Sequence, residues 1–175
     1  AACGTTPPAG APSPATAAAP PVEAVERPFP DDSLYPLLVA EFALRRQAFD
    51  VALDHYREQA PLLADAGVAA HTTRLAQYLQ DEQALLEAVQ LWLQMDPDDL
   101  EANNTAATAL TRQGRGLEAL PHLAVIARSG HQANFPSVLK GFEQQSPQQK
   151  AELIAGLNAL AEEFPDDPAL LLTQA

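Results

Sequence analysis

The sequence contains a single cysteine, Cys3, so no disulfide can form within the chain. Aromatic residues are also scarce, at 6% of 175 residues, and glycine occurs only 8 times. Ala and Leu dominate the remainder, and both residues favour helix. No run of 18 apolar residues is present beyond the N-terminal end, so we expect no membrane-spanning helix in this sequence.

Basic residues are few relative to acidic ones. The chain has 10 Lys and Arg residues against 23 Asp and Glu residues, which gives a formal net charge of -13 at pH 7. A protein with this charge repels phosphate backbones and anionic lipid head groups. We therefore expect no nucleic-acid partner.

Sequence motifs for catalysis and metal binding are missing. The four histidines are scattered and form no His-x-x-x-His pair, and no second cysteine is available to complete a zinc site. No phosphate-binding glycine loop and no Gly-x-Ser-x-Gly turn occurs. The sequence therefore predicts a protein that is not an enzyme, with no catalytic residue, no metal site and no cofactor.

The tripeptide Pro-Asp-Asp, in contrast, occurs three times, at residues 30–32, 97–99 and 165–167. The copies are 67 and 68 residues apart, which is twice a period of about 34 residues. Aspartates at a helix start accept bonds from free N–H groups and oppose the positive end of the helix dipole. We therefore expect these aspartates to cap helices, and the equal spacing predicts stacked helical hairpins.

The N-terminal residues predict an anchor and a tether. Ala1-Ala2-Cys3 resembles the end of a bacterial lipoprotein signal, in which the cysteine is acylated. In that class Gly4 after the cysteine implies an outer-membrane lipoprotein facing the periplasm, held to the membrane only by the lipid on Cys3. The alternative is an ordinary free cysteine. Residues 4–28 are rich in proline and alanine, so we expect residues 1–28 to form the lipoprotein N-terminus and a disordered linker.

From residue 29 onward, bulky and small residues alternate at helical spacing. Phe49-x-x-Ala52-x-x-x-Tyr56 recurs as Leu85-x-x-Ala88-x-x-x-Trp92, with Trp92 expected in the core. The third copy contains Ala106, Ala107, Leu110, Gly114, Ala119, Leu123 and Ile126. At these positions the chain resembles the tetratricopeptide repeat (TPR) family. The resemblance implies an all-α, TPR-like α-solenoid of antiparallel helix hairpins over residues 29–175, with about four hairpins and the start of another.

The chain departs from the family pattern at several points. The usual Leu-Gly pair is replaced by Val39-Ala40, Leu75-Ala76 and Ala106-Ala107, and the opening Trp is missing. The segment between Tyr56 and Leu75 is interpreted as a long linker containing Pro61. Pro121 lies inside the helix expected over residues 116–128 and predicts a modest kink there.

The last part of the chain has the clearest helix-start signals. Residues 134–145 predict a short helix, and Ser146-Pro147 supplies an N-cap followed by a first-turn proline. A helix is expected from Pro147 to about Glu163, with Leu153, Ile154, Leu157 and Leu160 on its buried side. Residues 168–175 should dock on this unit, and we expect the chain to be the N-terminal part of a longer protein.

In the TPR family the first helix of each hairpin lines the concave face. The positions that this implies here carry amide, hydroxyl, charged and apolar side chains, which suit an extended peptide or a helix of another protein. They are Leu34, Leu37, Glu41, Leu44, Arg45, Thr73, Gln77, Gln80, Glu101, Asn104, Thr108 and Arg112, with Phe135, Val138 and Phe142 as an extension. The chaperone-binding members hold a terminal carboxylate in a clamp, but the first clamp position here is Leu37.

The resemblance implies a non-enzymatic scaffold that binds other envelope proteins. It looks like the outer-membrane repeat lipoproteins of the LbcA type, which are adaptors for periplasmic carboxy-terminal processing proteases. Two alternatives stay open. One is a pilotin or secretion-assembly lipoprotein with the same anchor and repeats, and the other is the recognition arm of an enzyme whose catalytic domain lies beyond Ala175.

Overall fold

A computed structural model describes residues 29–174 of the protein, and this part of the chain contains helices and no strand. The predicted tether and Cys3 lie outside the described residues. The α-helices are α1 (Leu34–Arg45), α2 (Phe49–Leu63), α3 (Ala66–Leu79), α4 (Glu82–Met95), α5 (Leu100–Arg112), α6 (Gly116–Arg128), α7 (Pro147–Glu163) and α8 (Pro168–Gln174). Two 3-10 helices, η1 (Phe135–Leu139) and η2 (Phe142–Gln144), lie between α6 and α7.

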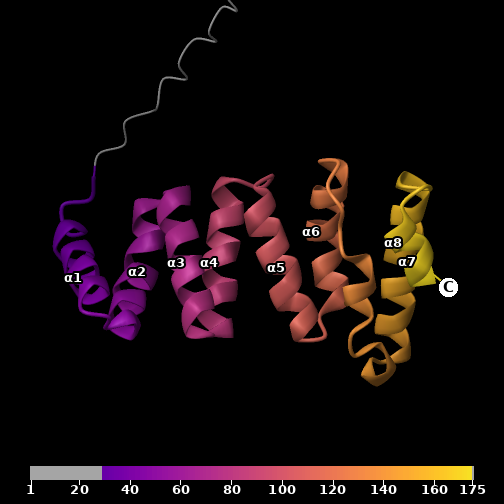
Figure 1. The fold of residues 1–175 in the computed structure, drawn as a ribbon, viewed down its shortest axis with the longest axis horizontal. Helices are drawn as coiled ribbons and strands as arrows, with labels where there is room; N and C mark the ends of the chain where they lie inside the picture. Colours follow the sequence, from indigo (N-terminus) through magenta and orange to yellow (C-terminus); the bar gives the residue numbers. More distant parts are fainter. Residues whose placement is uncertain (1–28, 175) are drawn as a thin grey trace, which may run out of the picture.

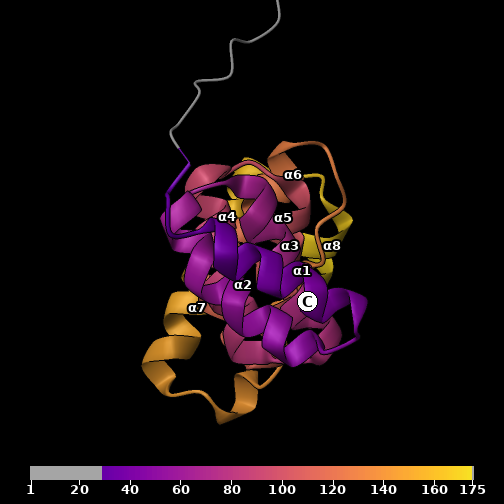
Figure 2. The ribbon, with the colours of Figure 1, turned by 90° about the vertical axis from the view of Figure 1, so that its left-hand side faces the viewer.

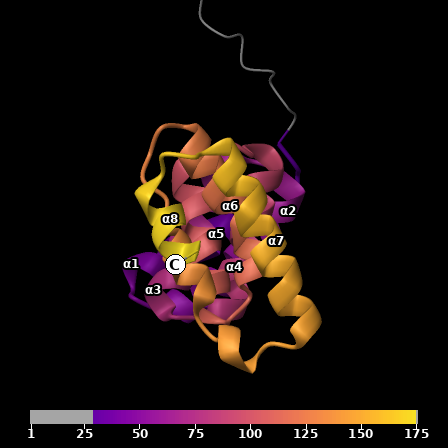
Figure 3. The ribbon, with the colours of Figure 1, turned by 90° about the vertical axis from the view of Figure 1, so that its right-hand side faces the viewer.

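The helices form hairpins that stand side by side in chain order, from α1 at one end to α7 and α8 at the other (Figure 1). Within the row α1 packs on α2, α3 on α4 and α5 on α6, while α2 contacts α3 and α4 contacts α5. The hairpin of α1 and α2 faces outward at one end (Figure 2), and α7 with α8 closes the other (Figure 3). The predicted fold, a TPR-like all-α solenoid, is confirmed.

Aspartate side chains cap the N-terminus of the first helix in most hairpins, at a regular interval along the chain. Asp65 accepts a bond from the Val68 N–H at 3.0 Å, and Asp99 accepts one from Ala102 at 2.8 Å. These two caps are separated by one repeat period, and Asp167 caps α8 a further two periods along the chain. The repeat period predicted from the Pro-Asp-Asp copies is therefore present in the helix caps, although the cap of α3, Asp65, is not part of such a tripeptide.

The capping role predicted for both aspartates of each copy is only partly correct. In the second and third copies the second aspartate, Asp99 or Asp167, makes the capping bond, while Asp98 and Asp166 are exposed. In the first copy the N-cap of α1 is Ser33, which makes no side-chain capping bond. One reason is geometric, since only the residue next to the first turn can reach its N–H groups.

The boundary between α2 and α3 differs from the predicted linker. Helix α2 continues through Pro61 to Leu63, and α3 begins at Ala66, so only residues 64 and 65 connect them. Pro61 is exposed in the last turn, where its missing N–H costs a single bond. Ala64 adopts the left-handed conformation that ends α2, with φ 44°, and Asp65 then caps α3. The predicted long linker is wrong.

The core consists of three clusters that follow the row of helices. The first is built around Ala52, Tyr56 and Ala76, and the second around Val89, Trp92 and Ala106. Trp92 is 4% exposed, which confirms that it belongs to the core. Alanines in the facing helices let bulky side chains of the next helix approach closely, which is the packing that the sequence pattern predicts.

The fourth unit departs from the hairpin pattern in its first half. Residues 134–145 form η1 and η2 where a short helix was predicted, whereas α7 spans Pro147–Glu163 as expected. Ser146 and Gln149 bond reciprocally as a capping box at the start of α7. The segment before α7 projects beyond the stacked helices (Figure 3).

The buried side of α7 contains Leu153, Leu157 and Leu160, but Ile154 is 47% exposed. Its predicted burial is wrong because residue 154 lies about 100° around the helix from residue 153, outside the narrow stripe that contacts α6 and α8. Helix α8 packs on α7 and η1 with Leu170 fully buried. Residues 168–174 therefore dock on the fourth unit, as expected.

Candidate protein-binding face

Equivalent positions in the three first helices, α1, α3 and α5, can be matched through a shared backbone bond. At the end of each helix an N–H bonds to the carbonyl five residues earlier: Ala48 to Ala43 at 2.9 Å, Asp81 to Ala76 at 3.0 Å, and Arg115 to Leu110 at 2.9 Å. The matched carbonyls recur once in each repeat period. This bond therefore aligns the helices independently of side-chain type.

The alignment places side chains in rows that cross the three helices. One row contains Leu37, Ala70 and Asn104, the next Glu41, Arg74 and Thr108, and the third Arg45, Tyr78 and Arg112. We refer to these nine residues as the first-helix face. The rows contain six of the predicted residues of α1 and α5, whereas Leu34, Leu44 and Glu101 lie outside them, so the sequence-based alignment of these two helices agrees with the structure.

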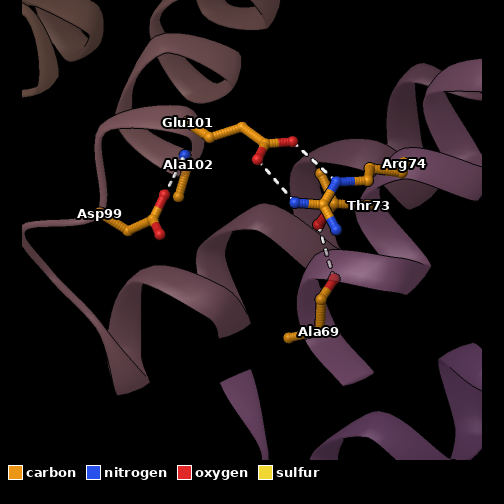
Figure 4. Close-up of polar contacts among 6 residues, drawn as sticks. All are labelled: Ala69, Thr73, Arg74, Asp99, Glu101 and Ala102. Atoms are coloured by element: carbon orange, nitrogen blue, oxygen red, sulfur yellow. Dashed lines mark hydrogen bonds and ion pairs between the residues drawn. The ribbon is translucent and has the colours of Figure 1, made fainter. Parts of the chain in front are cut away.

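The prediction for α3 is displaced by one turn. Thr73 is 1% exposed and its hydroxyl donates to the Ala69 carbonyl at 2.8 Å, so it does not belong to an open face (Figure 4). The matched position is Ala70, which is itself only 5% exposed, so the open part of the rows in α3 consists of Arg74 and Tyr78. The small pair equivalent to Ala106 and Ala107 is Thr72 and Thr73, not Leu75 and Ala76 as predicted. A Thr-Thr pair gives no small-residue signal, which explains the error.

Arg74 is the functional candidate that the sequence pattern missed. Its Nε and Nη2 atoms donate to the two Glu101 carboxylate oxygens at 2.7 and 2.6 Å, joining α3 to α5 (Figure 4). The guanidinium carbon lies 5.4 Å from the centre of the Trp92 ring. The Arg74 bond holds the pKa of Glu101 below its usual value. Because both groups are exposed, the pair contributes only about 0.2–1 kcal/mol to stability.

The α1 residues of the prediction lie in different environments. Leu34 is 58% exposed, whereas Leu37 and Leu44 are half-buried against the first core cluster. Glu41 accepts a hydrogen bond from the Tyr56 hydroxyl. The pKa of Tyr56 is raised, mainly because the hydroxyl is buried and secondly because of this bond. Arg45 is exposed at the end of the helix.

An exposed apolar stripe, which the prediction did not contain, runs beside these α1 residues. Tyr35, Leu38 and Phe42 are 76%, 48% and 61% exposed and follow each other at three- and four-residue spacing. Apolar side chains gathered in this way are typical of contact surfaces.

Two neighbouring hollows border the first-helix face, and Arg112 lines both. The first, of about 450 Å³, is lined by Gln77, Gln80, Glu82, Leu85 and Arg112. The second, of about 370 Å³, contains Asn104 and Thr108 in its lining. The structure therefore brings together Gln77, Gln80, Asn104, Thr108 and Arg112 of the predicted set, while Glu101 is engaged by Arg74 outside both hollows.

The predicted extension through the fourth unit is not a surface. Phe135 and Val138 are 0% exposed and belong to the third core cluster, which also contains Leu120, Leu153 and Leu170. Phe142 is half-buried, with the Lys150 ammonium 5.2 Å from its ring centre. Their burial follows from η1, which lies against α5, α6 and α8 and uses both side chains as core.

Most basic side chains in the described range are neutralised locally. Six of the nine Lys and Arg residues in 29–174 lie within 4 Å of a carboxylate, and the other three are Arg45, Arg46 and Lys140. Two of these three, Arg45 and Lys140, lie on the first-helix face or in the second hollow. Unpaired cations in an acidic protein are available to a negatively charged partner.

Other features of residues 29–174 bear on chemistry. No group of three metal-ligating side chains occurs in this range. Its helices are too short or too polar to cross a bilayer. His122 is partly buried, its Nδ1 lies 2.9 Å from the Asn103 amide oxygen, and burial lowers its pKa.

Comparison with known proteins agrees with this architecture. No profile of a protein family matches the chain. The chain is 34% identical over 147 residues to the TPR repeat-containing protein PA4667 of Pseudomonas aeruginosa. The similar region is 84% of this chain and 25% of that protein, so the chain spans about a quarter of the length of this relative. The similarity and the stacked hairpins together support a TPR-type scaffold for protein–protein interaction.

Proposed function

We propose that this chain is a non-enzymatic scaffold that binds another polypeptide along the first-helix face. The row Arg45, Tyr78 and Arg112 carries the proposal, because three consecutive first helices present a large polar or aromatic side chain at the same position. Rows that repeat at the spacing of stacked hairpins suit a ligand that runs along the array.

The chemistry of this row is typical of binding hot spots. Tyr78 is 68% exposed, and its ring meets Phe49 edge to face at 5.1 Å, which limits its motion. Arg45 has no ion-pair partner in residues 29–174, and Arg112 has one at 3.4 Å. Tyrosine and arginine dominate the energy of many protein interfaces because each combines a large contact area with directed hydrogen bonds.

Charge reversal of the two arginines tests the proposal. We expect Arg45→Glu with Arg112→Glu to reduce partner capture severalfold while leaving helicity unchanged, because both side chains are exposed. The assay is chemical crosslinking and affinity capture from the cell envelope, with far-UV circular dichroism as the folding check.

The matched control is Arg57→Glu with Arg128→Glu, which changes net charge by the same amount on the second helices α2 and α6. Equal capture by the wild type and the Arg45/Arg112 variant would contradict the proposal, and so would an equal loss in the control.

The same proposal extends to an adaptor role at the bacterial outer membrane. We propose that Cys3 is lipidated, that the scaffold faces the periplasm, and that it brings envelope proteins to a partner machine such as a carboxy-terminal processing protease. The residues around Cys3 and the TPR-type array support this proposal. Cys3→Ala should move the protein from the outer-membrane fraction to the periplasm, and unchanged fractionation would remove the anchor. Failure to co-purify with such a protease from crosslinked envelopes would contradict the adaptor role.

A further inference from the structure

The second hollow lies between the C-terminal half of α5 and the 3-10 helix η1. We call it the α5–η1 hollow. Its lining includes Asn104, Thr108, Arg112, Asn134, Ser137 and Lys140. None of these residues is acidic, although the chain as a whole carries a net charge of -13. The hollow is therefore a local exception to the charge of the protein.

Its two cations have unused bonding capacity. Lys140 makes no ion pair with the described residues. Arg112 makes one contact, to Glu82 at 3.4 Å, whereas Arg74 donates two short bonds to its carboxylate partner. An arginine has five N–H donors, so Arg112 can still donate to a ligand in the hollow. Asn104, Asn134, Thr108 and Ser137 line the same space, and the Ser137 hydroxyl already donates to the Asn134 carbonyl at 2.7 Å.

The wall that carries Lys140 is held rigidly on α5 and α6. A Cβ added at Gly116 would lie 2.2 Å from the Val138 carbonyl oxygen, so the backbones touch there. The Gln145 side-chain amide donates to the Gly114 carbonyl at 3.2 Å and fastens the other end of the segment. Phe135 and Val138 are fully buried beneath it. The hollow is therefore formed before any ligand arrives, which lowers the cost of binding.

We propose that the α5–η1 hollow binds a carboxylate of the partner polypeptide, with an aliphatic side chain of the ligand against the exposed Pro136. This deepens the proposed function and rests on it. Glu82 pairs with Arg112, so the two cations and this carboxylate together carry one positive charge. That charge matches a single carboxylate better than a phosphate dianion. Charge-assisted N–H···O bonds from an arginine and a lysine are stronger than bonds between neutral groups.

The probe is a pair of short peptides that differ only in the carboxylate. Acetyl-Ala-Ala-Leu with a free C-terminus and the same peptide with a C-terminal amide are titrated into ¹⁵N-labelled protein. We expect the free acid to shift the amides of Gly114, Ser137 and Lys140, and the amidated peptide to bind at least tenfold more weakly. A third peptide, acetyl-Ala-Glu-Leu-amide, separates the two sources: binding by it assigns the site to an acidic side chain, and binding by the first peptide alone assigns it to a C-terminus.

Variants then test the two cations. Lys140→Gln and Arg112→Gln should each weaken binding of the carboxylate peptide about tenfold. Lys150→Gln is the control, because Lys150 is the other lysine of the chain and pairs with Glu143 outside the hollow. The proposal is overturned if acid and amide bind equally, if neither peptide shifts these amides, if Lys140→Gln binds normally, or if inorganic phosphate binds more tightly than the peptides.

The outcome can be separated from that of the scaffold proposal. Lys140 is outside the three rows of the first-helix face, and Arg45 is outside the hollow. If Arg45→Glu alone reduces partner capture while the peptides fail to bind, the scaffold proposal stands and the carboxylate site is wrong. If the peptides bind but Arg45→Glu leaves capture unchanged, the hollow binds carboxylates and the first-helix face is not the partner surface.

Discussion

Gly116→Ala is the most direct test of how the fourth unit is attached to the repeats. Gly116 is the first residue of α6 and is buried. An alanine Cβ at this position would lie 2.2 Å from the Val138 carbonyl oxygen and 3.0 and 3.1 Å from the Val138 carbonyl carbon and Cα. All three atoms belong to backbone, so no side chain can rotate away to make room.

Two effects of the substitution oppose each other. Alanine has a helix propensity up to about 1 kcal/mol better than glycine, and less than this in a first turn. Relieving the contact requires η1 to move by about 1 Å, and overpacking of this kind costs about 1–3 kcal/mol. Because Phe135 and Val138 would be pulled from the core at the same time, we expect the overpacking to dominate and the free energy of unfolding to fall by about 1–3 kcal/mol.

The assay is urea denaturation followed by circular dichroism, together with amide chemical shifts of residues 133–140. Gly67→Ala is the matched control, since Gly67 is also in a first turn but its nearest neighbour is the Asp65 side-chain oxygen at 3.0 Å. The control should be close to neutral. A Gly116→Ala protein as stable as the wild type, with unchanged shifts in residues 133–140, would refute the close contact.

Four other substitutions test three features of the fold. Asp99→Ala should lower the free energy of unfolding by about 1 kcal/mol through loss of its cap, while Asp98→Ala should have little effect, as measured by urea denaturation. Trp92→Ala should cost about 3–5 kcal/mol, measured by circular dichroism, and a cost under about 1 kcal/mol would show that the second core cluster is not tightly packed. Burial lowers the pKa of His122, so below pH 6.5 the unfolded chain binds more protons and stability should fall as the pH decreases; His122→Gln should reduce this slope, and an unchanged slope would contradict it.

Local signals in the sequence predicted most of the helices. The start of α7 shows why: Ser146 and Gln149 form a capping box, Pro147 occupies the first helical position, and no distant residue is needed to specify this start. The repeat period likewise depends on aspartates that bond within one turn. A helix boundary was predicted wrongly where the local signal was weaker. Pro61 suggested a linker, but α2 continues through it because a proline in the exposed last turn removes only one backbone hydrogen bond.

The candidate face was predictable in α1 and α5 but not in α3. The expected Leu-Gly position of α3 is occupied by Thr72 and Thr73, which are buried because each hydroxyl donates to the backbone carbonyl four residues earlier. Nothing in the type of residue distinguishes such a threonine from one that faces solvent. Because the predicted alignment of α3 was displaced by one turn, Arg74 and Tyr78 were not predicted as part of the face.

By itself the sequence determined that the chain is helical, that its hairpins repeat at a regular period, and where the capped helices begin, because these properties depend on contacts within a few residues. Only the tertiary structure decided which side of each helix is open, that Phe135 and Val138 are core, and that Arg112 and Lys140 line one hollow. Those properties depend on how far apart two backbones lie, as at Gly116 and Val138, and a spacing along the chain does not contain that distance.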